Sequence, residues 1–126
     1  MEIFMKVEEL RDFVVETLED MKARDLSVID VRGKTSITDF MVIASGTSDR
    51  HVKAIAEAVA FRAKQKGCPP MGQEGVRDGE WALIDLNGVV VHVMQSKVRD
   101  FYQLERLWSV DPAEAEKVLQ QQQQQQ

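Results

Sequence analysis

The hydrophobic positions at the start of the chain recur every three or four residues, and this spacing predicts an amphipathic helix. The stripe consists of Val7, Leu10, Phe13, Val14, Leu18 and Met21, with charged residues on the opposite side. A second stripe of the same spacing consists of Val52, Ile55, Ala56, Val59 and Ala63. Ser48 is suited to cap the start of this second helix, and Gly67, followed by two prolines, to end it.

Between the two helices, the apolar residues run together instead of recurring at helical spacing. "LSVIDV" (26–31) predicts a short strand, and "RGKTS" after it, with Gly33, predicts a turn. "DFMVIAS" (39–45) is almost wholly apolar, which is typical of a central strand buried on both faces.

The strongest local pattern is "EWALIDLNGVVVHVM" (80–94), where Asn87-Gly88 joins two strand-like runs and predicts a two-residue hairpin. This turn sets the register, and one side of the hairpin is then wholly apolar: Leu86 faces Val89, Ile84 faces Val91 and Ala82 faces Val93. The other side is mixed: Asp85 faces Val90, Leu83 faces His92 and Trp81 faces Met94. We therefore expect the first side to be core and the second to be incompletely covered or used for contact.

These elements predict a single α/β domain in the order α-β-β-α-β-β-α, with helices packed on a mixed sheet. The stretch "MGQEGVRDG" before the hairpin is expected to be irregular, and "KVRDFYQLERLW" (97–108) to form a helix or two helical turns. We place the domain at residues 1–110, and a C-terminal helix with a tail of seven glutamines at residues 111–126.

Composition narrows the function classes. The formal net charge of the 126 residues is −5, which argues against a DNA-binding protein or any protein that binds mainly a phosphate backbone. Residues 71–126 contain five basic and nine acidic residues, which suits either a basic partner or a solubilising surface. The single cysteine, Cys68, and the lack of a long apolar run predict a cytoplasmic protein without a membrane-spanning helix.

A nucleotide-binding or nucleotidyltransferase-like enzyme is the alternative that the element order raises. "ASGTSD" (44–49) could hold phosphates at the start of the second helix, although a capped strand-to-helix turn explains it as well. The transfer reaction also requires carboxylates that hold metal ions. Asp85 is followed two positions later by Asn87, which the hairpin turn uses, so the carboxylate pair is missing. We expect no catalytic residues, no metal site and no cofactor.

Large apolar side chains are the remaining candidates for function. In a helical "RDFYQLERLW" (99–108), we expect Phe101, and with it Leu107, to face inward, whereas Tyr102, Leu104, Glu105 and Trp108 lie at or near a surface. Trp81 would project from the mixed side of the hairpin, and tryptophan and tyrosine are enriched at interface hot spots. The basic residues of the second helix could touch RNA as a secondary contact or form a solvated face.

Three blocks of this chain are similar to those of one known family. They are "TSITDFMVIASGTSDRHVKAIAEAV" (35–59), "EGVRDGEWALIDLNGVVVHVM" (74–94) and "RDFYQLERLW" (99–108). In this order and in a single register over residues 5–110, they resemble the ribosomal silencing factor family (RsfS, also called Iojap-like). Met41 stands where an aromatic residue is common in the family.

The resemblance implies a non-enzymatic translation repressor whose fold is related to nucleotidyltransferases. It implies binding to the large ribosomal subunit through ribosomal protein fourteen, which would block joining of the small subunit. Family-type contacts would map onto Trp81, Asp85, Tyr102, Leu104, Glu105 and Trp108, with Glu74 and Gly75 as contributors. A homodimer that hides this surface is an alternative use of the same patch.

Overall fold

The computed structural model describes residues 5–102, and of Tyr102 the backbone alone. Helix α1 (Val7–Asp20) leads into strands β1 (Arg24–Asp30) and β2 (Phe40–Gly46), followed by helix α2 (Asp49–Gln65). Strands β3 (Gly72–Glu74), β4 (Trp81–Asp85) and β5 (Val89–Gln95) come next, and helix α3 (Ser96–Tyr102) ends the described part. The predicted positions of the second helix's cap and of its end are confirmed, because Ser48 Oγ accepts a hydrogen bond from the His51 backbone N–H at 3.0 Å and Gly67 has a φ of +83°.

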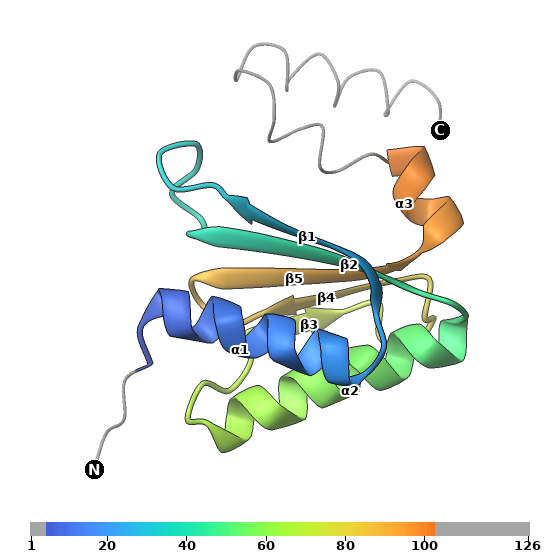
Figure 1. Ribbon diagram of the computed structural model, residues 1–126, viewed down its shortest axis with the longest axis horizontal. Helices are drawn as coiled ribbons and strands as arrows, with labels where there is room; N and C mark the ends of the chain where they lie inside the picture. The colour runs from blue at the N-terminus through green and yellow to red at the C-terminus, as the bar shows by residue number, and fades with distance from the viewer. Residues whose placement is uncertain (1–4, 103–126) are drawn as a thin grey trace.

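The five strands form one mixed sheet in the order β1-β2-β5-β4-β3. The central pair, β2 and β5, is parallel, and the other neighbours are antiparallel. Helices α1 and α2 lie side by side against one face of the sheet, and α3 leaves from the end of β5 towards the other face (Figure 1). The expected mixed α/β sheet is thus confirmed.

The predicted hairpin register is confirmed at every pair. Strand β4 meets β5 with Trp81 opposite Met94, Leu83 opposite His92 and Asp85 opposite Val90. The Leu86 N–H donates to the Val89 carbonyl at 2.9 Å and closes the turn. Asn87 and Gly88 both have positive φ angles, +59° and +107°, which is why this pair is favoured in a two-residue turn.

The predicted element order is wrong by one strand. Residues 72–74, expected to be irregular, form β3 and pair antiparallel with β4 at the edge of the sheet. All three residues are exposed, and the strand contains neither alternation nor a β-branched residue. Short, exposed edge strands of this kind leave almost no hydrophobic pattern. The observed order is therefore α-β-β-α-β-β-β-α.

Alternation along the strands separates the core into two clusters. The first face of the sheet, defined by Ala82, Ile84, Val91 and Val93 of the hairpin, packs against the apolar stripes of α1 and α2. The second face, defined by Trp81, Leu83 and Asp85 of β4 and Val90, His92 and Met94 of β5, carries a smaller cluster around Ile43 and Met94. Strand β2 is buried along its whole length, as predicted for a central strand.

Candidate protein-binding face

Three of the predicted contact residues, Trp81, Asp85 and Glu74, lie in the described part of the chain and belong to the second face of the sheet. Along β4, Trp81, Leu83 and Asp85 are half-buried, whereas Ala82 and Ile84 between them are fully buried under α2. Glu74 pairs with Leu83 across β3 and β4 and so extends the same face to the sheet edge. Trp81, Asp85 and Glu74 therefore share one surface.

Trp81 is held in place by His92. The Trp81 Nε1–H donates to His92 Nδ1 at 2.9 Å, and the two ring centroids lie 5.8 Å apart. Because Nδ1 accepts this bond, a neutral His92 carries its proton on Nε2. His92 is buried, and this burial lowers its pKa from 6.5 to about 4. The imidazole thus stays neutral near pH 7 and can keep accepting the hydrogen bond from Trp81.

Asp85 and Gly75 are shaped by local backbone requirements. The Asn87 backbone N–H donates to Asp85 Oδ1 at 3.0 Å, so one carboxylate oxygen supports the hairpin turn. Gly75 has a φ of +74°, and a Cβ there would lie 1.9 Å from the Trp81 carbonyl oxygen. Glycine is therefore required where the chain after β3 passes close to the backbone of Trp81. Gly75 has a structural role beside Trp81.

Helix α3 is anchored on the second face by Val98 and Arg99. Val98 packs against the cluster around Ile43 and Met94, and Arg99 Nη1 donates to Ser45 Oγ at 2.9 Å. Phe101, predicted to face inward, is 51% exposed, so that prediction is wrong.

The remaining candidates belong to the C-terminal block. The side chain of Tyr102 and all of Leu104, Glu105, Leu107 and Trp108 lie outside the described residues. Their assignment to the docking surface stays a prediction.

A groove of about 260 Å³ lies on the second face, next to Asp85. The loop between β1 and β2 forms one wall through Ile37 and Thr38, and Leu83, Val90 and His92 form the other. The sequence pattern predicts a turn at "RGKTS" (32–36) and gives this loop no part in a site. The one signal it carries is Ile37, an aliphatic residue isolated among polar neighbours.

The loop before α2, weighed as a phosphate site, uses its backbone donors internally. The Thr47 N–H donates to His51 Nδ1 at 3.0 Å, and the His51 N–H donates to Ser48 Oγ. His51 Nε2 lies 2.8 Å from the Met21 carbonyl oxygen and ties this loop to the end of α1. A Cβ on Gly46 would lie 2.6 Å from Val52 Cγ2, so the glycine there serves close packing. This geometry favours a capped turn over a phosphate cradle.

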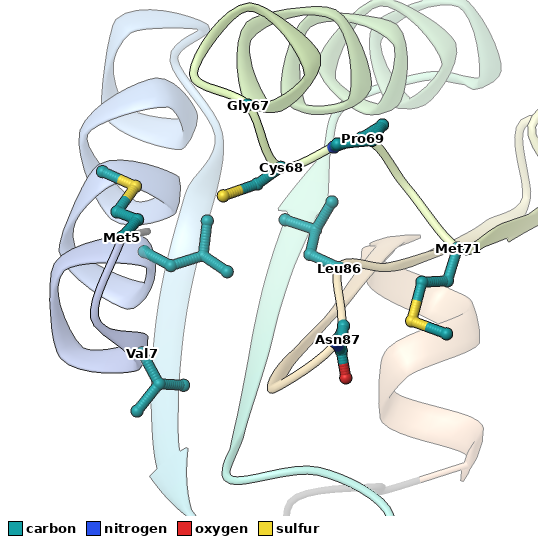
Figure 2. A pocket seen from close by; sticks show the side chains of 9 residues that line it. Met5, Val7, Gly67, Cys68, Pro69, Met71, Leu86 and Asn87 are labelled. Atoms are coloured by element: carbon teal, nitrogen blue, oxygen red, sulfur yellow. The ribbon is translucent and has the colours of Figure 1, made fainter. Parts of the chain in front are cut away.

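A second cavity, of about 300 Å³, lies on the helical side between the start of α1, the end of α2 and the β4–β5 hairpin (Figure 2). Met5, Cys68 and Leu86 line it, and their sulfur and methyl groups give it little chemistry. Within residues 5–102, no group of three or more His, Cys, Asp or Glu side chains could hold a metal ion. No helix in that range is long and apolar enough to cross a membrane.

Comparison with known proteins places the chain. The family described as "Ribosomal silencing factor during starvation" (RsfS) matches residues 5–126. The ribosomal silencing factor RsfS of Haemophilus influenzae is 44% identical over 100 residues, which cover 79% of this chain and 98% of that protein. A mouse protein named "Mitochondrial assembly of ribosomal large subunit protein 1" is 35% identical over 102 residues, 79% of this chain and 45% of the mouse protein.

The fold agrees with this placement. A crystal structure of a Chromobacterium violaceum protein has a TM-score of 0.82 and 42% sequence identity, and the match covers 83% of this chain and 88% of that one. The family is one of silencing factors and not of enzymes, in agreement with the sequence analysis. The chain belongs to the ribosomal silencing factor (RsfS) family.

Proposed function

We propose that this chain binds the large ribosomal subunit through the second face of its sheet and sterically prevents the small subunit from joining. Large-subunit ribosomal protein fourteen is the proposed partner, and translation in the cytoplasm is the process repressed. The names of its relatives support a role on the ribosome: one is a ribosomal silencing factor, and another refers to assembly of the ribosomal large subunit.

The single observation that carries the location of the site is the half-buried row of Trp81, Leu83 and Asp85 along β4. A tryptophan at the edge of an apolar face, with its N–H already bonded to His92, offers a rigid aromatic surface to a partner. The predicted residues Tyr102, Leu104, Glu105 and Trp108 would extend this surface beyond the described part.

Charge supports a basic protein partner. Asp85 and Glu74 both lie on the second face, in a C-terminal segment of net charge −4. Acidic groups at the rim of an apolar patch favour encounter with a basic surface, and ribosomal proteins are basic. Steric blocking requires no catalytic group, which fits a fold that we propose is related to nucleotidyltransferases but lacks their carboxylate pair.

Co-sedimentation with isolated large subunits tests the proposal. The wild-type chain should sediment with the subunits at physiological salt and reduce formation of complete ribosomes when small subunits are added. Trp81→Ala should weaken binding by about 30-fold, the loss of a typical hot spot. Circular dichroism of the variant should show an intact fold. Wild-type protein that stays in the supernatant would contradict the proposal.

A charge-only variant gives the sharper test. Asp85→Asn removes the negative charge, but the Asn side chain retains an oxygen that can accept from the Asn87 N–H. We expect slower association and a weaker dependence on salt. The matched control is Glu57→Gln, which removes one charge from the exposed side of α2, beyond the first face, and should leave binding unchanged.

A further inference from the structure

The groove beside Asp85 has the size and lining of a socket for one side chain. Its volume of about 260 Å³ lies below the range of about 300–1,000 Å³ that small-molecule sites occupy. Aliphatic groups of Ile37, Met41, Leu83 and Val90 line it, together with Asp85. An apolar socket with a carboxylate in its wall suits an aliphatic side chain whose neighbour is basic.

The wall formed by the β1–β2 loop is pre-organised. The Val31 N–H donates to the Asp39 carbonyl at 3.0 Å, and the Ile37 N–H donates to Thr35 Oγ1 at 3.2 Å. At the root of the loop, the Arg32 guanidinium bonds to Asp30. A loop fixed in this way loses little conformational entropy when a partner binds.

Ile37 lies at the rim of the groove and is 84% exposed. It is the most exposed of the large hydrophobic residues within the described range, and it contributes little to the core. Its exposure is therefore better explained by contact with a partner than by folding.

The groove is continuous with the proposed ribosome-binding surface. Asp85 belongs to both, and His92, which lines the groove, holds Trp81 through the 2.9 Å hydrogen bond. A partner that covers Trp81 and pairs with Asp85 must also pass over the groove.

We propose that the groove receives an aliphatic side chain of the bound ribosomal protein, next to a lysine or arginine that pairs with Asp85, and that Ile37 at its rim contacts the same side chain and determines specificity. This inference rests on the proposed function and adds the β1–β2 loop to the docking surface. The partner is thus recognised by an aliphatic residue adjacent to a basic one.

The test compares two exposed hydrophobic residues on opposite sides of the molecule. Ile37→Asp should weaken binding to isolated large subunits by about tenfold, because it places a charge at the rim of the apolar socket. Ile37→Leu keeps an aliphatic side chain at the rim and should bind as wild type does. The matched control is Phe61→Asp on α2, because Phe61 is 63% exposed on a helix that covers the first face. This variant should bind as wild type does. Thermal melts of all variants verify the fold.

The outcomes separate the two proposals. If wild-type protein binds subunits and Ile37→Asp binds equally well, the groove inference is overturned and the proposed function stands. If wild-type protein does not bind, the proposed function fails first. Light scattering provides the third arm: a change in self-association with Ile37→Asp, without a change in subunit binding, would assign the groove to a second copy of this chain and also overturn the inference.

Discussion

The two faces of the sheet share the same strands but differ in what they bury. On the first face, Ala82, Ile84, Val91 and Val93 meet the apolar stripes of two helices, and the cluster is aliphatic apart from Phe40. On the second face, the alternate residues of the same hairpin include a tryptophan, an aspartate and a histidine. Trp81 and His92 pair with each other and Asp85 accepts from the hairpin turn, so the second face depends on specific hydrogen bonds where the first depends on apolar packing alone.

The first face should carry most of the stability. Ile55 is fully buried between α2 and the sheet, and Ile55→Ala would leave a cavity there. We expect the free energy of unfolding to fall by about 4 kcal/mol, measured by urea denaturation. The folded fraction should still bind ribosomal subunits as wild type does. A loss below about 1 kcal/mol would mean that the first face is less tightly packed than it looks.

Lowering the pH should destabilise the protein through a residue of the second face, His92. Burial holds the pKa of His92 at about 4 in the folded state, whereas it is 6.5 in the unfolded chain, so unfolding takes up a proton between these values. The contribution of His92 to the free energy of unfolding is complete above pH 6.5. It falls by about 3 kcal/mol in total as the pH drops to 4.

Urea titrations at several pH values measure this slope, and a non-titrating variant gives its control. His92→Asn keeps an oxygen near the place of Nδ1 that can accept the Trp81 N–H, and it should flatten the pH dependence between 4 and 6.5. A variant with the wild-type slope would assign the acid sensitivity to other groups. Below this range, the Arg32 guanidinium lowers the pKa of Asp30 to about 2, so a further loss is expected as the pH falls from 3.8 towards 2.

The smallest effect on stability is expected from an exposed ion pair that links the β1–β2 loop to helix α1. Arg32, at the start of the β1–β2 loop, pairs with Glu8 of α1 at 3.1 Å, and both side chains are about half exposed. Glu8→Gln should change the free energy of unfolding by less than about 0.5 kcal/mol, because solvent screens such pairs. Subunit binding should be unaffected. A large loss of binding would show that α1 positions the β1–β2 loop.

The hairpin shows how far the sequence alone can lead. Asn87-Gly88 requires positive φ angles, and once that turn is set, every pairing from Trp81 to Met94 follows. The same register makes Trp81 and His92 diagonal neighbours, so their hydrogen bond was within reach of sequence reasoning. The placement of Trp81 and Asp85 on one face was predicted for this reason.

Other features depend on contacts that no local pattern contains. Strand β3 is three exposed residues whose pairing is decided by β4, and the prediction missed it. Helical spacing predicts that Phe101 faces inward, yet it is 51% exposed at the end of a short helix whose contacts to the sheet come from Val98 and Arg99. The groove requires the β1–β2 loop to lie next to β4 and β5, two segments far apart in the chain.

The parallel pairing of β2 with β5 has a consequence for the order of folding. Phe40 pairs with Val89 across the centre of the sheet, although the whole of α2, β3 and β4 lies between them in sequence. Such non-local pairs form late, since a long loop must close first, whereas the β4–β5 hairpin is local and can form early. The groove needs both segments, so a newly made chain gains its hairpin before it gains the socket. Binding through the proposed groove should therefore appear only after β2 and β5 have paired, later than the hairpin row of Trp81, Leu83 and Asp85.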